Sequence, residues 1–362
     1  MNTFSNEPNT SQAPHRSEPI QLSSKEKNLI ERAMLLSPTG GNSKPFSWEW
    51  KNKSLMIYHN ESLDKHYLNR NKHTSLLALG CMLTSVEVVA SFLNFNSVCK
   101  TDETTLTTQI DFEKLQVNSK KVESLKALFP FLELRSTYRG QFQVDPSPLL
   151  LAPSRIVNQQ SSITTVELKK HEQMLPSFLN YFIKAESYLW YQKMAMKDFI
   201  REVRFFSKKN NSTERGISSY DLGISLADQT LLYLLKNLPS VLSFMRKIPL
   251  LNFSFIKSSK ATFRNANFFL IRSNLESHSS LINAGKLAMQ TWLELESKGY
   301  KVQPLSFSSI PVLDARTQCL PEDTLNSFKN FYEEQAPKEL NKNFQFHNTL
   351  TPVWMLRFGK PE

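Results

Sequence analysis

Apolar residues recur at three- and four-residue spacings in three stretches of the chain, which is the pattern of helices that bury one face. The first stretch begins at Ser24 and places Leu29 and Ile30 on such a face. The second runs from about residue 75 to 95, and the third covers residues 280–302. We therefore expect three long helices that contribute to the hydrophobic core.

Shorter apolar runs between turn-forming residues predict strands. FSWEW (46–50) and SLMIYHN (54–60) form a predicted strand pair joined by a turn, and FFLIR (268–272) is a third predicted strand. A further helix is expected from Glu123 to Phe129. This mixture predicts an α+β fold, with a central and largely antiparallel sheet flanked by helices.

Two of the predicted helices are similar to each other. SLLALGCMLTSVEVVASFLNFNS (75–97) aligns without a gap with SLINAGKLAMQTWLELESKGYKV (280–302), and Gly80 matches Gly285. A glycine inside a helix costs about 1 kcal/mol relative to alanine, so this pair indicates close packing of helices. Each helix also follows a strand-like run, and the repeat therefore predicts two related halves in one chain.

The repeat divides the chain into an N-terminal half, residues 23–130, and a C-terminal half, residues 131–362. Residues 1–22 are polar and rich in proline, asparagine and serine, which is typical of a disordered tail. The stretch 186–257 is rich in phenylalanine, methionine and lysine and is expected to form a helical lid.

Composition narrows the class of protein. Of the 362 residues, 40% are hydrophobic, which is enough for a folded core, and the net charge of +11 indicates an anionic partner. Cys81, Cys99 and Cys319 are widely spaced and suit neither a disulfide framework nor a zinc site. The N-terminal region has no apolar signal segment, so we expect a cytoplasmic protein.

SPTGGNSKPFSW (37–48) is a turn-rich loop in a chain that has only nine glycines. Gly40 and Gly41 beside Asn42 allow positive φ angles and a close approach of the backbone to a ligand, and the flanking prolines stiffen the loop. The alternative is an ordinary connection between a helix and a strand.

LRSTYRGQF (134–142) places Arg135 and Arg139 on either side of Thr137. If this segment begins a helix, two guanidinium groups, a hydroxyl and backbone N–H groups converge on one anion, which is the chemistry of a phosphate site. The alternative is a pair of solvated arginines that form ion pairs with Glu133 or Asp145.

Together these segments resemble those of the flavin-dependent nitroreductase family. SPTGGNSKPFSW is similar to the family's Pro-Ser-x-x-Asn-x-Gln-Pro segment, RSTYR to its phosphate segment, and PVWMLRFGKP (352–361) to its last strand. Here the glycine loop precedes the arginine segment, the reverse of the usual order. This order resembles that of the internally duplicated branch of the family, in which one chain forms a pseudo-dimer and a lid covers one FMN.

The resemblance implies that one FMN lies between the two halves. The residues implied to contact it are Pro38, Thr39, Gly40 and Asn42 at the flavin ring and ribityl chain, Arg135, Thr137 and Arg139 at the phosphate, and the backbone of Leu305 and Ser306 at the flavin N5 edge. No catalytic side chain is expected, because the cofactor carries the chemistry.

The implied activity is an NAD(P)H-dependent reduction of an electron-poor acceptor, of the nitroaromatic or quinone type. The protein is expected to be a monomer, with neither a metal nor a nucleic-acid partner. The alternative is a protein that sequesters or stores FMN under a closed lid without turnover. Two departures from the family favour this alternative: Lys44 stands where the family has glutamine, and Phe307 narrows the space above the flavin.

Two further features have simple interpretations. His59, His66 and His73 recur every seven residues, but no carboxylate or cysteine stands at a compatible spacing, so we interpret them as solvated histidines and not as metal ligands. Residues 231–257 are apolar but contain charges and prolines, which argues against a membrane span. Contact of this basic stretch with an anionic membrane surface is a third functional hypothesis.

Overall fold

The structure is a computed structural model, and it describes residues 20–115, 119–146, 154–159, 162–207, 214–222, 226–237, 249–275, 277–344 and 350–362. Residues 1–19 of the predicted tail lie outside this part of the chain, as do residues 238–248 of the stretch proposed to contact membranes. The α+β class is confirmed, because helices accompany several antiparallel strands.

The N-terminal part of the chain forms a four-stranded antiparallel sheet, here called the first sheet. Its strands, in spatial order, are β1 (Phe46–Lys51), β2 (Ser54–His59), β4 (Thr107–Lys114) and β3 (Phe95–Asp102). The accompanying helices are α1 (Ser24–Leu36), α2 (His73–Phe92), α3 (Lys120–Lys126) and α4 (Phe131–Leu134). The predicted β1–β2 pair, and the predicted helix that begins at Ser24, are confirmed.

The C-terminal part forms a five-stranded antiparallel sheet, the second sheet. Its strands, in spatial order, are β10 (Lys301–Pro304), β11 (Thr351–Gly359), β9 (Asn267–Ser273), β6 (Ser162–Lys169) and β5 (Ser154–Gln159). Helix α10 (His278–Ser297) connects β9 to β10, and three short helices follow: α11 (Ile310–Arg316), α12 (Asn326–Asn330) and α13 (Ala336–Asn343).

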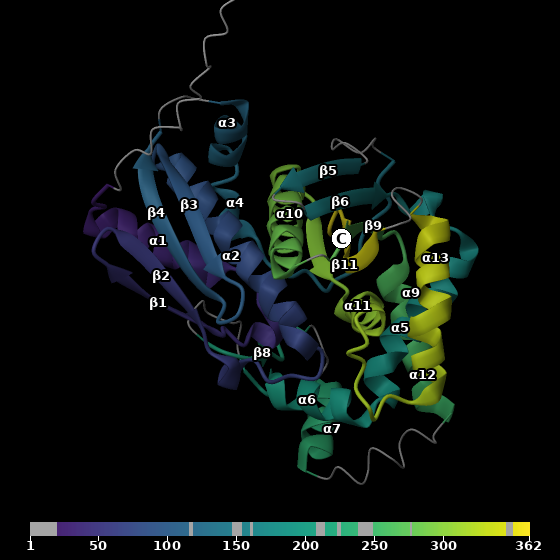
Figure 1. Cartoon of the computed structure of the whole chain (residues 1–362). Coiled ribbons are helices and arrows are strands. Elements are labelled where there is room, and N and C mark those ends of the chain that lie inside the picture. Colours follow the sequence, from purple (N-terminus) through teal and green to yellow (C-terminus); the bar gives the residue numbers. More distant parts are fainter. Residues whose placement is uncertain are drawn as a thin grey trace, which may run out of the picture.

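The prediction of a single central sheet was wrong. The two sheets are separate, and α2 and α10 lie between them (Figure 1). Side chains of both sheets and both helices form one continuous hydrophobic core. The sequence pattern identifies the apolar face of each strand, but it does not say which strands share hydrogen bonds.

Helices α2 and α10 cross at the two glycines that the repeat singles out. A Cβ atom on Gly80 would overlap the carbonyl oxygen of Ile282, and a Cβ atom on Gly285 would overlap that of Leu77. The predicted close packing of the two helices is therefore confirmed. The contact is also reciprocal, because Leu77 matches Ile282 in the same alignment that matches Gly80 with Gly285.

The two sheets share an order of strands. The order β1-β2-β4-β3 in the first sheet corresponds to β6-β9-β11-β10 in the second, and all of these neighbours are antiparallel. Helix α2 connects β2 to β3 just as α10 connects β9 to β10. The two units differ in the connections before and after these elements. A turn at Asn52 and Lys53 joins β1 to β2, whereas residues 170–266 join β6 to β9; residues 103–106 join β3 to β4, whereas residues 305–350 join β10 to β11.

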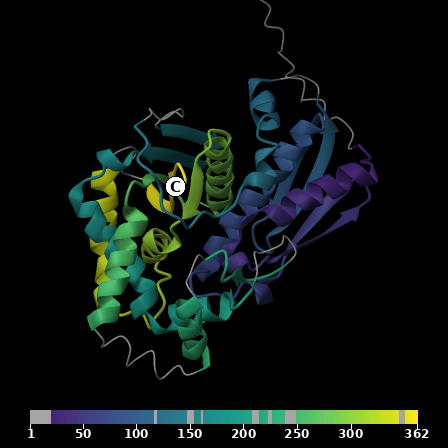
Figure 2. The ribbon, with the colours of Figure 1, turned by 180° about the vertical axis from the view of Figure 1, so that it is seen from behind.

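Residues 170–266, here called the insertion, are mainly helical and include the predicted lid. Their elements are α5 (Pro176–Tyr191), α6 (Lys193–Glu202), β7 (Val203–Arg204), β8 (Ile217–Ser218), α7 (Leu226–Asn237) and α9 (Pro249–Phe263). Helices α5 and α9 of this segment lie on the outer side of the second sheet, whereas α6 and α7 lie at the bottom of the view (Figure 1, and from behind in Figure 2). The insertion starts before residue 186 and ends after residue 257, so the predicted lid is only its central part.

Among the described residues, one helix is long and apolar enough to cross a membrane. It covers Arg70–Phe92 and includes α2. Of its most apolar window, 89% is buried inside the protein. This burial is typical of a core helix, and its apolar residues are accounted for by the contact with α10. The cytoplasmic location stays a prediction.

Candidate functional site

A cavity of about 590 Å³ lies where both halves of the chain and the insertion meet. Four segments of the chain line most of it: residues 35–44, 135–139, 303–307 and parts of the insertion. All of the residues predicted to contact a cofactor line this cavity, namely Pro38, Thr39, Gly40, Asn42, Arg135, Thr137, Arg139, Leu305 and Ser306. Its volume is in the range that cofactor pockets occupy.

The glycine loop takes the backbone conformation that its sequence predicts. A short 3-10 turn covers Gly40–Asn42, and φ is positive at Gly41 (56°) and Asn42 (53°). Gly40 is needed for a different reason, because a Cβ atom there would stand 2.7 Å from Nε2 of His66. The loop thus brings backbone close to the cavity, where side chains would fill the space.

Asn42 holds the insertion in place. Its Nδ2 group donates to the carbonyl oxygens of Glu214 (2.9 Å) and Gly216 (3.0 Å), and the Gly216 N–H donates to the Asn42 carbonyl (3.1 Å). The donor group of the Asn42 amide is therefore committed to the protein, although the resemblance assigns this residue to the flavin.

The arginine segment does not begin a helix, so the helix N-terminus considered for the phosphate site is not present there. Thr137 forms a parallel bridge with Val302 of β10, and the Tyr138 N–H donates to the Val302 carbonyl over 3.0 Å. The segment is thus extended beside the outer edge of the second sheet. An edge strand has unpaired backbone N–H and C=O groups. The segment forms hydrogen bonds with these groups instead of forming a local helical turn.

Arg135 has unused hydrogen-bonding capacity. Its guanidinium lies over the ring of Trp292, 4.6 Å from the centroid, and Nη2 donates to the carbonyl of Leu36 over 2.5 Å. Its Nε is buried and has no partner among the described residues. Burial lowers the pKa of this group from its usual value, so an anion beside Arg135 would relieve a desolvated charge.

Arg139 donates from Nη1 to the backbone carbonyl of Asp221 in the insertion, over 2.9 Å. Burial lowers the pKa of Arg139, and the charge of Asp221 opposes this shift. The predicted alternative partners are engaged elsewhere: Glu133 pairs with Arg32 at 2.9 Å, and Asp145 accepts a hydrogen bond from the hydroxyl of Tyr300. A guanidinium has five donors, so both arginines retain capacity for a phosphate.

The turn that contains Leu305 and Ser306 lies at another wall of the cavity. The Leu305 N–H donates to the carbonyl of Met355 over 2.9 Å, whereas the Ser306 N–H has no partner among the described residues. Of the two backbone donors that the resemblance implies, only the one at Ser306 is available to a ligand.

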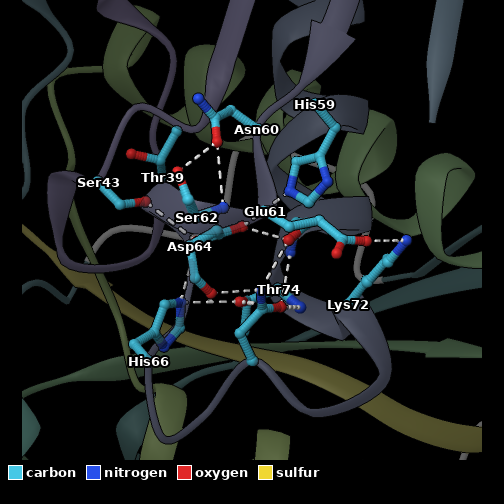
Figure 3. A network of polar contacts seen from close by, with 12 residues as sticks. Thr39, Ser43, His59, Asn60, Glu61, Ser62, Asp64, His66, Lys72 and Thr74 are labelled. Carbon is cyan, nitrogen blue, oxygen red and sulfur yellow. Dashed lines mark hydrogen bonds and ion pairs between the residues drawn. The ribbon is translucent and has the colours of Figure 1, made fainter. Parts of the chain in front are cut away.

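The interpretation of His59 and His66 as solvated histidines was wrong. Their side chains are only 2% and 11% exposed, and both rings lie 3.4 Å from the carboxylate of Asp64 (Figure 3). Asp64 also accepts hydrogen bonds from the hydroxyls of Ser43 and Ser75. The sequence signal was the aspartate between the two histidines in HNESLDKH.

The third histidine, His73, is buried too. Its Nδ1 lies 2.7 Å from a carboxylate oxygen of Asp314, and burial raises the pKa of this carboxyl to about 6. Among the residues that the structure describes, no group of three or more histidine, cysteine and acidic side chains is arranged to hold a metal ion.

Burial and hydrogen bonding oppose each other in the Asp64 network. Burial acts to raise the pKa of Asp64, but hydrogen bonds from His59, His66 and Ser75 outweigh it and leave this pKa well below its usual value. For His66, burial acts to lower the pKa, and the bond to Asp64 and the charge of Glu202 raise it overall. Since His66 lines the cavity, the network gives that wall a buried, partly positive group.

The basic and the acidic residues that line the cavity come from different parts of the chain. The basic residues that line it come from outside the insertion: Lys44, His66, Arg135 and Arg139. The acidic ones among the described residues all come from the insertion: Glu186, Asp198, Glu202 and Asp221. Our sequence analysis missed this acidic wall, because helical periodicity does not show which face of a helix will cover a cavity.

No protein-family model matches this chain, and no curated protein shows significant similarity to it.

Proposed function

We propose that this protein binds FMN in the cavity and is an NAD(P)H-dependent oxidoreductase of the nitroreductase type. The observation that carries the proposal is the meeting of three distant segments, around residues 38–42, 135–139 and 305–306, at one cavity. Each of these segments resembles a flavin-contacting sequence of the nitroreductase family.

The internal symmetry supports a pseudo-dimer with a nitroreductase-like fold. The two sheets share a strand order, and the reciprocal Gly80–Gly285 contact is what a two-fold axis between equivalent helices requires. A homodimer of such units places its cofactor between subunits. On this proposal, the single chain supplies both sides of the site and works as a monomer.

The residues fit a phosphorylated flavin. Arg135, Thr137 and Arg139 would bind the phosphate through guanidinium donors and a hydroxyl, which are the donor types that phosphate prefers. The unpartnered Nε of Arg135 is one donor that such a group would satisfy. The backbone of Pro38, Thr39 and Gly40 would lie against the ring system, and the Ser306 N–H would donate to its reactive edge.

When bound, FMN supplies the redox chemistry, accepting a hydride and passing electrons to an electron-poor acceptor such as a nitroaromatic or a quinone. The protein's part is to hold the phosphate, to exclude water with the insertion and to orient the two substrates in turn.

A second candidate function is the sequestration or storage of FMN without turnover. The contacts that favour it are those that tie the insertion to the glycine loop and to Arg139, since they close the cavity from one side. In this case the cofactor would bind, but neither a nicotinamide nor an acceptor would reach it.

The absorbance spectrum of the purified protein tests both functions, first as isolated and then after anaerobic addition of NADPH and NADH. The oxidoreductase predicts a flavin spectrum that bleaches within seconds. Sequestration predicts a flavin spectrum that bleaches only with dithionite. If no flavin binds, even after reconstitution with FMN, both functions are excluded.

A further inference from the structure

Glu186 is a carboxyl group at the cavity wall that the proposed function leaves without a role. It stands on α5 of the insertion, and its Oε1 accepts a hydrogen bond from the hydroxyl of Ser308 over 3.0 Å. Ser308 ends the short turn Ser306–Ser308, whose first residue is assigned to the reactive edge of the flavin. Glu186 thus lies next to the place where acceptor chemistry is expected.

Two tyrosines fix α5 against this turn. The hydroxyl of Tyr332 donates to the carbonyls of Ala185 (3.2 Å) and Phe307 (3.0 Å), and the hydroxyl of Tyr181 donates to the carbonyl of Ser308. The part of α5 that carries Glu186 is therefore fixed against the turn that carries Ser308, the residue that donates to its carboxyl. A group with a fixed position at a cavity wall is suited to proton transfer.

The charged and titratable groups that face Glu186 leave it without an ion pair in the described part of the chain. Arg357 of β11 is the cation that acts on it, but its guanidinium is already bonded to Gln303 (2.6 Å) and to the carbonyls of Thr262 (2.7 Å) and Gly140 (2.9 Å). Burial raises the pKa of Tyr181 and Tyr332 well above the usual value, so both stay neutral.

Burial therefore dominates the ionisation of Glu186. It raises the pKa of this carboxyl to about 7, although the hydrogen bond from Ser308 and the charge of Arg357 act in the opposite direction. At neutral pH a substantial fraction of the protein carries the protonated acid, which is the condition for a general acid. Glu202, a second carboxyl of the acidic wall, lies elsewhere in the cavity, against Gly41.

We propose that Glu186 is the proton donor to the electron acceptor bound in the cavity. The proposal rests on the proposed function, because it needs a hydride that comes from NAD(P)H through the bound cofactor. It assigns to this chain a catalytic acid that is delivered by the insertion, a segment with no counterpart between β1 and β2.

Reduction of a quinone acceptor requires one hydride and one proton. The quinone receives a hydride at one carbonyl oxygen and needs one proton at the other to become the hydroquinone. The O–H bond of Glu186 breaks, its proton moves to that oxygen, and the carboxylate left behind takes a proton from solvent. The sum over both half-reactions is NAD(P)H, one proton and quinone giving NAD(P)⁺ and hydroquinone.

The test compares Glu186→Gln with Glu202→Gln in anaerobic stopped-flow measurements. Glutamine keeps an oxygen that accepts from Ser308 but has no acidic proton. We expect re-oxidation of the reduced protein by menadione to slow by about 10²- to 10⁴-fold in Glu186→Gln. Reduction by the nicotinamide should change less than about threefold, because that half-reaction needs no proton donor. In Glu202→Gln, the pH profile of re-oxidation should keep its wild-type shape.

Infrared spectroscopy of the flavin-free protein gives a readout that does not depend on activity. The wild-type minus Glu186→Gln difference should contain a protonated-carboxyl band that titrates with a midpoint near 7. In Ser308→Ala the midpoint should rise, because the Ser308 hydrogen bond lowers this pKa.

The outcomes separate this proposal from the function on which it rests. A wild-type protein without flavin overturns the proposed function, and with it the donor role. A wild type that binds flavin and turns over, with a Glu186→Gln variant re-oxidised at the wild-type rate, overturns the donor role alone. So does the absence of the infrared band.

Discussion

The first and second sheets share a strand order and differ in what covers their outer faces. In β2 the buried residues alternate, with Leu55 and Ile57 at 0% exposure and Met56 half-buried between them. In β9 every residue is buried. Phe269 and Ile271 belong to the core between the sheets, whereas Phe268 and Leu270 belong to an aromatic cluster with the insertion.

This difference follows from the insertion, which stands between β6 and β9 where the first sheet has only a turn between β1 and β2. The segment that joins β6 to β9 covers the outer face of the second sheet together with α12 and α13, and it extends to the cavity, where it supplies the acidic wall. The first sheet keeps the short turn and one partly solvated face. A shared architecture thus becomes asymmetric through two long connections, of which the insertion is the longer.

The largest expected effect concerns Arg135 and Arg139, the two arginines that line the cavity beside the edge of the second sheet. Replacing Arg135 and Arg139 together with alanine should weaken FMN binding by about 3–6 kcal/mol, since each charge-assisted bond contributes about 1.5–3 kcal/mol. Fluorescence titration with FMN measures the change. The control variant removes two lysines of the exposed helix α3, Lys120 and Lys121, and unchanged flavin affinity in the arginine variant would refute the site.

The next comparison tests how much burial of its outer face stabilises each sheet. Leu270→Ala should lower the free energy of unfolding by about 2–5 kcal/mol, because it leaves a void under the insertion. Met56→Ala on the outer face of the first sheet should cost less than about 1 kcal/mol, because that side chain is half-buried. Urea unfolding of both variants measures the difference, and equal costs would mean that the insertion does not protect the second sheet.

Substitutions at the two glycines of the α2–α10 crossing should have equal effects on stability. Gly80→Ala and Gly285→Ala should each lower the free energy of unfolding by about 2–3 kcal/mol, because each new Cβ atom meets a backbone carbonyl that cannot move aside. Thermal unfolding of the two variants provides the measurement. A large difference between them would show that the contact is not reciprocal in energy.

The smallest effect concerns the Asp64 network, which belongs to the first half. The pKa of Asp64 is lowered on folding, so its contribution is complete above about pH 4 and is lost as the pH falls. The pKa of His66 is raised, so its contribution is complete below about pH 6.5 and is lost as the pH rises through the folded value.

Asp64→Asn should therefore cost about 1–2 kcal/mol between these limits and less on either side of them. Urea unfolding at pH 3, 5.5 and 8 measures the profile. Glu322→Gln, a change at an exposed carboxyl, is the matched control. A cost for Asp64→Asn that is independent of pH would contradict the assigned protonation states.

Local features of the sequence predicted much of the fold. The apolar spacing that begins at Ser24 predicts α1, and a capping box between Ser23 and Glu26 stabilises its start. The matched glycines predict the contact between α2 and α10. In each case a residue's own conformational or steric property determines the local structure, so the sequence alone carries the signal.

Several of the failures share a physical cause, because they depended on a neighbour that is distant in the chain. The arginine segment is extended because Val302 offers an edge to pair with, and His73 is buried because Asp314 meets it. The acidic wall exists because α5 and α6 fold over the cavity. Which surfaces meet in this way is decided by packing, not by the period of apolar residues.

The contact between Gly80 and Gly285 also bears on how such a protein can evolve. In a dimer of identical chains, one altered codon changes both sides of the axis, and any inserted segment appears twice. In this chain the two glycines are encoded separately, so selection can act on one side while the other stays unchanged. A lengthened connection between β6 and β9 can therefore be acquired without altering the turn between β1 and β2.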